Sequence, residues 1–407
     1  MKYIVKVPNN TIKATVNLPA SKSISNRLLI LNELAYSSYS VENLSDSDDT
    51  QVLLKALYSN DSHFDIGAAG TAMRFLTAYL SRIVGEWHIT GSERMKNRPI
   101  KILVDALNSL GANITYEEKE GFPPLRILGS SLSGGEIELD GGVSSQYISA
   151  LLMIAPSMQN GLTLQLTGNV ISKPYIRLTL QLMNEFGIQS DWHDNRIHIP
   201  PQTYIPKKIR VESDWSAASY WYEIAALSEN ADIELTGLFP KSSQGDAAVA
   251  SLFKQLGIRS IFLKNGNVRL QKIPVTCKRF DFDFTDQPDL AQTMAVTCAM
   301  LQIPFHFSGL QSLKIKETDR IEALKTELGK LGFILQSGED SLSWQGECKT
   351  PETNPVIATY EDHRMAMAFA PVALKREEIA IEDPQVVSKS YPNYWENLKQ
   401  LAVISEQ

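Results

Sequence analysis

Six short stretches of the sequence share one pattern, which recurs along the whole chain. In each stretch a small or polar turn leads directly into an apolar run, rich in Ala, Leu and Met, that has the spacing of a helix. Recurrence of such helix starts predicts a repeated structural unit. The starts lie at Lys22, Gly70, Ser144, Asp214, Asp289 and His363, with gaps of 48, 74, 70, 75 and 74 residues.

A second signal recurs in phase with the first. A β-rich run that closes on a small polar residue or turn follows every helix start, 20 to 24 residues further on. A constant offset over six copies predicts six units, each with a helix and several short strands, the first copy being shortened. The runs end at Asn43, Gly91, Gly168, Gly237, Gly309 and Asp383.

Length and composition indicate two domains. With 407 residues, 43% of them hydrophobic, the chain can form two full cores, and three copies per domain is the simplest division. No apolar run reaches the roughly 18 residues that span a membrane, and residues 1–7 alternate like a strand rather than a signal peptide. We therefore expect a cytoplasmic protein that does not contact membranes.

Charge and cysteine content argue against several classes of function. The net charge of −7 is unfavourable for binding nucleic acid, which needs a basic surface. Cys277, Cys298 and Cys348 are odd in number and lack the spacing of metal ligands. Free buried thiols are expected rather than a disulfide or a zinc site, and redox chemistry is not expected.

Basic residues gather near the repeated turns despite the acidic background. If the copies are related by pseudo-rotation, these two classes of loop converge on one cationic place, to which helix N-termini add positive partial charge. The ligand should carry several negative charges, and Arg side chains suit carboxylate and phosphate. The residues at helix starts are Lys22, Arg27, Arg74 and Arg364, and those after strand ends are Arg98, Lys316, Arg320 and Lys389.

Each motif alone has a simpler structural explanation. A Lys-Ser or Gly-Thr pair after a turn usually only caps a helix, and residues 316–320 could form a solvated helix face. Helix capping alone does not explain the joint pattern, because residues 144–146 put two hydroxyls and an amide at one helix start, more than one cap needs. Asp289 and Glu317 are carboxylates among cations, a setting suited to acid–base chemistry on a polyanionic small molecule.

At these residues the chain resembles the 3-phosphoshikimate 1-carboxyvinyltransferases, the EPSP synthase family, over nearly its whole length. The resemblance rests on LPASKSISNR (18–27), AGTAMR (69–74), RMKNRPI (94–100), SKPYI (172–176), KETDR (316–320) and DHRMAM (362–367). It implies an α/β fold of two similar domains, each of three βαβαββ repeats, with the active site in the cleft between them. The implied domains are residues 20–212, and residues 1–19 plus 213–407, the N-terminal strand completing the second.

The resemblance also implies the reaction. The family transfers the enolpyruvyl group of phosphoenolpyruvate to the 5-hydroxyl of shikimate 3-phosphate, releasing phosphate, without a metal or organic cofactor. A monomer is expected. In the catalytic roles, Asp289 would accept the proton of the attacking hydroxyl, Lys316 would orient that hydroxyl, and Glu317 would protonate the methylene carbon.

The remaining implied roles concern substrate binding. Residues expected to bind shikimate 3-phosphate are Lys22, Ser23, Arg27, Ser144, Ser145, Gln146, Ser172, Tyr175, Asp289, Ser312 and Lys316. Those expected to bind phosphoenolpyruvate are Lys22, Gly70, Arg98, Gln146, Arg320, Arg364 and Lys389; Lys22 is thus shared by both substrates and is counted with the catalytic pair.

Three positions depart from the family pattern, and two other functions are open. Ala68 and Ser312 stand where asparagine is common, and Phe75 stands where proline is common. One alternative is the sister enolpyruvyl transferase that acts on UDP-N-acetylglucosamine, but that family has Lys-Asn at the first helix start and a Cys in the loop at residues 94–98. The other is a non-enzymatic binding module or an RNA-end-processing relative, against which the carboxylate pair and the lack of a basic surface speak.

Overall fold

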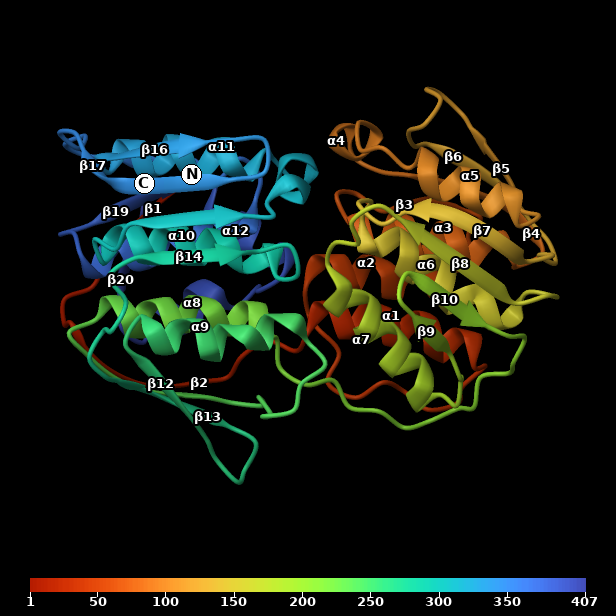
Figure 1. The fold of residues 1–407 in the computed structure, drawn as a ribbon, viewed down its shortest axis with the longest axis horizontal. Coiled ribbons are helices and arrows are strands. Elements are labelled where there is room, and N and C mark those ends of the chain that lie inside the picture. The colour runs from red at the N-terminus through yellow and green to blue at the C-terminus, as the bar shows by residue number, and fades with distance from the viewer. The chain divides into compact units, whose positions relative to one another are not determined.

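The computed structural model describes residues 1–407, which form two compact units, each with its own hydrophobic core (Figure 1). Unit 1 comprises Met1–Pro19 and Glu212–Gln407, and unit 2 comprises Ala20–Val211. The chain thus leaves unit 2 after Val211, one residue before the boundary expected from the sequence.

Unit 1 contains three four-stranded sheets of identical topology. In each, the first two strands of the spatial order are parallel and the other neighbours are antiparallel. The first sheet is β2 (Thr11–Val16), β11 (Asn230–Leu235), β13 (Val268–Lys272) and β12 (Ile258–Phe262). The second is β14 (Phe280–Asp283), β15 (Phe305–Ser308), β17 (Leu342–Cys348) and β16 (Phe333–Ser337). The third is β18 (Val356–Ile357), β19 (Ile379–Glu382), β1 (Lys2–Lys6) and β20 (Val403–Glu406).

The N-terminal strands complete two of these sheets. β1 lies between β19 and β20, and β2 pairs in parallel with β11. Val5 is fully buried in this position. Both chain termini therefore belong to unit 1, where Figure 1 shows them near each other. The N-terminal segment thus contributes two strands to unit 1, where one was expected.

In each sheet of unit 1, a helix lies between the two parallel strands in chain order: α8 (Trp215–Leu227), α10 (Ala291–Met300) or α12 (His363–Phe369). These helices pack against one another, and α8 is buried at every residue except Ser216. Helices that are apolar on all sides require such a position. The other elements are α9 (Val249–Gln255), α11 (Arg320–Lys330), α13 (Tyr394–Leu398) and the 3₁₀ turns η2 (Gly245–Ala248), η3 (Pro288–Leu290), η4 (Gln311–Ile315), η5 (Ala370–Leu374) and η6 (Pro384–Lys389).

Unit 2 repeats the same topology in two four-stranded sheets. They are β3 (His63–Asp65), β4 (Gly85–Thr90), β6 (Leu125–Gly129) and β5 (Asn113–Tyr116), and β7 (Gly135–Asp140), β8 (Leu162–Thr167), β10 (Arg196–Ile199) and β9 (Asp191–His193). The helices are α1 (Lys22–Leu34), α2 (Asp48–Leu57), α3 (Gly70–Ser81), α4 (Glu93–Lys96), α5 (Lys101–Ser109), α6 (Ser145–Ile154), η1 (Ala155–Ser157) and α7 (Lys173–Glu185). None of the helices in either unit combines the length and apolarity needed to cross a membrane.

Most of the repeat pattern is confirmed. All six predicted helix starts lie within two residues of a helix, and five of the six β-rich runs are strands: β4, β8, β11, β15 and β19. The prediction is wrong for residues 41–43, where only an isolated bridge joins Glu42 to Arg210. Asn43 has φ +57°, which interrupts an extended strand, and its amide bonds to the Val211 carbonyl instead.

The thiols are only partly as expected. All three cysteines are free, and Cys298 is buried. Cys277 is half-buried and Cys348 is exposed, so the expectation of buried thiols is wrong for these two. Cys348 is the last residue of β17, where it pairs with Phe333 of β16 and its side chain is exposed.

Candidate active site

In unit 1 three helix starts bring carboxylates to one end of the central helices. Asp214 and Asp362 cap α8 and α12 by accepting backbone N–H groups of Ala217 and Arg364, both at 2.9 Å. Asp289 lies in the turn η3 that leads into α10. Aspartate suits these positions because its oxygens satisfy the open N–H groups of a first helical turn. The repeat thus places acidic groups side by side that are far apart in the sequence.

The guanidinium of Arg320 binds two of these carboxylates and a third one, Glu317. Arg320 is the first residue of α11 and is only 2% exposed. Its Nε donates to Asp362 at 2.6 Å, its Nη1 donates to Asp289 at 3.0 Å, and its Nη2 donates to Glu317 at 2.9 Å and more weakly to Asp362 at 3.5 Å. Burial alone would lower the pKa of Arg320, but the three ion pairs outweigh it and raise the pKa above its ordinary value.

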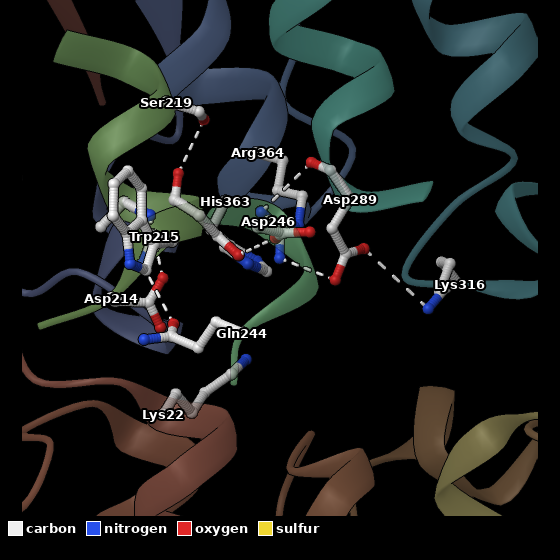
Figure 2. Close-up of polar contacts among 12 residues, drawn as sticks. Lys22, Asp214, Trp215, Ser219, Gln244, Asp246, Asp289, Lys316, His363 and Arg364 are labelled. Carbon is white, nitrogen blue, oxygen red and sulfur yellow. Dashed lines mark hydrogen bonds and ion pairs between the residues drawn. The ribbon is translucent and has the colours of Figure 1, made fainter. Parts of the chain in front are cut away.

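Three further cations complete this arrangement. Arg364 Nη2 binds Asp289 Oδ2 at 2.9 Å, and Lys316 Nζ lies 4.0 Å from Asp289 Oδ1 (Figure 2). Lys389 Nζ binds Glu317 at 2.9 Å. Burial lowers the pKa of Lys316, although the charge of Asp289 opposes this.

The structure therefore brings together nearly all the residues of unit 1 that the sequence marked. The members are Asp289, Lys316, Glu317, Arg320, Arg364 and Lys389. Ser312 differs, because it lies half-buried in η4 and no hydrogen bond or ion pair joins it to this group.

Sequence reasoning missed three residues of this group. Asp362 was considered only as part of the motif at residues 362–367, although an aspartate two residues before Arg364 at a helix start predicts a helix cap beside that arginine. Tyr220, inside the apolar run of α8, accepts a hydrogen bond from Arg364 Nη1 at 3.3 Å, and burial raises its pKa so that the phenol stays neutral. Asp246, which accepts a hydrogen bond from Ser216, belongs to a turn that no periodic pattern marks.

In unit 2 the central residue is Arg27, which is held by neutral groups. It is 2% exposed and donates to Thr179 at 2.7 Å, to Ser149 at 3.1 Å and to the Ser23 carbonyl at 2.9 Å. No carboxylate pairs with it, and burial lowers its pKa to about 10. A buried guanidinium without a counterion is costly, so this site is suited to binding an anion.

The two hydroxyl partners of Arg27, which were not predicted, could have been found from their spacing in the sequence. Ser149 and Thr179 come one helical turn, four residues, after the predicted site residues Ser145 and Tyr175. Residues at this spacing share a helix face. The ring centroids of Phe75 and Tyr175 lie 5.5 and 6.0 Å from Cζ of the Arg27 guanidinium. Phe75, which stands where the family commonly has proline, therefore places an aromatic ring against this cation.

The other predicted residues of unit 2 lie at helix starts. Gln146 Nε2 donates to Thr71 at 3.1 Å and thereby joins the first turns of α6 and α3, while the Ser144 hydroxyl caps α6. Lys22 Nζ binds Asp49, a residue that the sequence did not mark, at 3.2 Å. The predicted hydroxyl residues Ser23 and Ser145 are half-buried, and Ser172 is buried with φ +55° at the start of α7.

Gly70 allows two arginines to approach the start of α3. A Cβ atom at this position would lie 2.5 Å from Arg74 Nη1 and 2.7 Å from Arg98 Nη1. Arg74 donates to the Gly70 carbonyl at 2.8 Å, whereas Arg98 Nε is buried and has no hydrogen-bond partner in the chain. The unpartnered N–H of the Arg98 guanidinium is suited to binding phosphate or carboxylate.

We expect Asp362→Ala to lower the stability of unit 1. The Asp362 side chain is completely buried, and removing one partner of a buried ion pair leaves the other charge uncompensated, at a cost of about 3–5 kcal/mol. Denaturant-induced unfolding at neutral pH measures this loss.

Asp232→Ala is the matched control in the same unit. Asp232 pairs with Arg269 at the surface, where both side chains are at least one-third exposed, and exposed ion pairs contribute little. Equal losses in the two variants would contradict the role given to Asp362.

Comparison with known proteins identifies relatives over the whole chain. The family model described as EPSP synthase (3-phosphoshikimate 1-carboxyvinyltransferase) matches residues 7–59 and 55–398. A protein named 3-phosphoshikimate 1-carboxyvinyltransferase from Bacteroides fragilis is 60% identical over 401 residues, which is 98% of this chain and 97% of that protein. Another of the same name from Vibrio cholerae is 37% identical over 434 residues, covering 99% of this chain and all of that protein.

Solved structures share the fold at low sequence identity. An EPSP synthase from Acinetobacter baumannii superposes with a TM-score of 0.79 at 20% identity, covering 100% of both chains. The enolpyruvyl transferase NikO from Streptomyces tendae has a TM-score of 0.75 at 16% identity, covering 100% of this chain and 98% of its own. These likenesses confirm the predicted fold class, the two-domain enolpyruvyl transferase architecture.

Proposed function

This chain belongs to the EPSP synthase family, and on that premise we propose that it transfers the enolpyruvyl group of phosphoenolpyruvate to the 5-hydroxyl of shikimate 3-phosphate. The products are 5-enolpyruvylshikimate 3-phosphate and inorganic phosphate, an intermediate step in making chorismate and the aromatic amino acids. The observation that carries the proposal is the pair of carboxylates, Asp289 and Glu317, that share the buried guanidinium of Arg320.

The unit 1 group is suited to the enolpyruvyl half of the reaction. Arg320 and Arg364 are placed to bind the carboxylate of phosphoenolpyruvate, because guanidinium groups pair with carboxylates through two parallel hydrogen bonds. Lys389, now bound to Glu317, would bind the phosphate together with Arg98 and the backbone at Gly70. The substrate would in this way replace part of the internal ion pairing with its own charges.

The unit 2 residues are suited to shikimate 3-phosphate. Arg27 has only neutral partners, so a sugar-like phosphate would supply the missing negative charge. The hydroxyls of Ser144, Ser145 and Ser172 would add hydrogen bonds to that phosphate, as expected of donors at helix starts. The remaining predicted ligands are Lys22, Ser23, Gln146, Tyr175 and Ser312.

We propose an addition–elimination in which two carboxylates move protons. Once the substrate phosphate has replaced Glu317 as the partner of Lys389, Glu317 takes up a proton from solvent. The 5-hydroxyl oxygen bonds to C2 of phosphoenolpyruvate, its proton goes to Asp289, and Glu317 gives its proton to the methylene carbon. The bond between C2 and the phosphate oxygen then breaks, and the phosphate leaves with the proton held by Asp289. Glu317 takes a proton back from the methyl group, which re-forms the double bond. Lys316 lies near Asp289 and would orient the hydroxyl, while the surrounding cations stabilise negative charge in the transition state.

The remaining sequence expectations are part of the same proposal. We propose that the enzyme works in the cytoplasm as a monomer and needs no metal or organic cofactor. The function acting on UDP-N-acetylglucosamine is not favoured, because the curated relatives are named for the 3-phosphoshikimate reaction.

Release of phosphate from phosphoenolpyruvate tests the proposed function. The purified protein should release phosphate rapidly with shikimate 3-phosphate, and not with UDP-N-acetylglucosamine or with phosphoenolpyruvate alone. Treating the protein with a chelator should leave the rate unchanged. Activity only with UDP-N-acetylglucosamine, or with neither acceptor, would refute the proposal.

Asp289→Asn should lower the turnover number by about 10²–10⁴, because it removes the proton acceptor while keeping the shape of the side chain. Shikimate 3-phosphate affinity, measured by calorimetry, should stay near the wild-type value. Asp283→Asn is the control, since Asp283 is an exposed acid at the end of β14 in the same unit. If Asp289→Asn turned over at the wild-type rate, the assignment of the base would be wrong.

A further inference from the structure

Asp246 is a buried carboxyl group that the proposed reaction does not use. It lies in η2 and is 3% exposed. Its Oδ2 accepts a hydrogen bond from the hydroxyl of Ser216, and its Oδ1 is buried without any hydrogen-bond partner in the chain. An ionised carboxylate is very costly to bury with one oxygen unsatisfied.

Gln244, two residues before Asp246, fixes the turn that places Asp246 beside the cations of the site. The Gln244 side chain accepts the Trp215 N–H at 3.0 Å and donates to the Ser213 carbonyl at 2.8 Å, which ties η2 to the start of α8. Figure 2 shows the Asp246 side chain next to the Arg364 guanidinium, whose other side binds Asp289. Asp246 therefore lies where its charge acts on the site.

Three charged groups face Asp246 from the elements packed around it. They are Asp289 from η3, Arg364 from α12 and Asp214 from the start of α8. Burial raises the pKa of Asp246 to about 7, the charge of Asp289 adds to this rise, and Arg364 opposes it. The group can thus change its charge near neutral pH.

The charge balance of the site depends on this proton. Arg320, Arg364, Lys316 and Lys389 give four positive charges, and the acids bound to them, Asp289, Glu317 and Asp362, give three negative charges. Among these seven groups the positive charges exceed the negative charges by one. Ionisation of Asp246 next to Arg364 would cancel this excess.

We propose that Asp246 is an un-ionised carboxylic acid in the form of the enzyme that binds substrate and that its proton keeps the positive charge of Arg364 available to the carboxylate of an anionic substrate. This inference rests on the proposed function for the identity of that substrate, phosphoenolpyruvate. Asp246 is a positioning residue, because it acts through Arg364 and not on the reacting atoms. Ionised Asp246 would compete with the substrate carboxylate for the same guanidinium.

The first test is the pH dependence of the KM for phosphoenolpyruvate at saturating shikimate 3-phosphate. Between pH 7.5 and 8.5, where the substrate phosphates are already fully ionised, the wild-type KM should rise by up to about tenfold as the binding-competent fraction falls. Asp246→Asn cannot ionise and should lose most of this rise. The steady-state rate of phosphate release gives the KM for both proteins.

Ser216→Ala supplies a second variant in case Asp246→Asn folds poorly. Its hydroxyl stabilises the ionised form of Asp246, so its removal should shift the rise in the KM for phosphoenolpyruvate to higher pH. Lys316 also titrates in alkaline solution, but it is present in all three proteins and cancels in the comparison.

The second test measures ionisation without any substrate. An acid whose pKa is higher in the folded than in the unfolded protein binds a proton on folding, so its contribution to stability falls from about pH 4 to about pH 7 and is constant above. The Tm of Asp246→Asn relative to wild type should therefore rise between pH 4.5 and 7.5. Asp232→Asn is the control, because its ion pair with Arg269 lowers the Asp232 pKa and its relative Tm should stay constant over this range.

The two tests separate the inference from the proposed function. If the wild type released no phosphate from phosphoenolpyruvate and shikimate 3-phosphate at any pH, the proposed function would fail, and the Tm series would still decide whether Asp246 is protonated. If the wild type was active and Asp246→Asn kept the same pH dependence of the KM for phosphoenolpyruvate, the inference would be overturned. A relative Tm that does not change with pH would overturn it as well.

Discussion

The ion pairing of one buried guanidinium organises the catalytic part of this protein. Arg320 binds three carboxylates that precede or begin three different helices. A fork of fixed geometry can hold three acids at set distances, which a flexible ammonium cannot do. Because a buried charge must be compensated, the packing of α10, α11 and α12 and the positions of Asp289 and Glu317 depend on one another.

The polar turn that begins the helix of each repeat has different consequences in the two units. Every repeat begins a helix with a polar turn, so the open N–H groups of several helices collect within each unit. In unit 1 these turns carry acids that are paired with arginines and lysines. In unit 2 the buried Arg27 has hydroxyls as partners instead. One unit thereby holds carboxylates paired with cations and the other a buried cation among hydroxyls, although their topology is shared.

Sequence reasoning recovered what depends on local chemistry. Polar turns followed by apolar helical runs located all six helix starts, and strand ends were found where a small residue follows a β-rich run. Residues 41–43 show the limit of this approach, because the left-handed conformation of Asn43 is stabilised by a contact with Val211, distant in sequence. Local composition could not reveal that contact.

Within the site, prediction succeeded for residues that lie at the repeated turns and failed for residues brought in by packing. Arg320 and Arg364 stand in charged motifs, so their gathering could be expected. Tyr220 lies in an apolar run and Asp246 in an irregular turn, and each reaches Arg364 only through the tertiary arrangement. The side-chain amide of Gln244, which fixes that turn, gives no signal in the sequence.

The steady-state kinetics of Arg320→Lys test the central claim, that the planar fork of Arg320 holds the catalytic carboxylates in place. Lysine keeps the positive charge but cannot bind three acids in fixed directions. We expect kcat/KM for phosphoenolpyruvate to fall by about 100-fold or more while the protein stays folded. A variant with kinetics within a factor of about two of wild type would show that charge alone suffices, and would contradict this account.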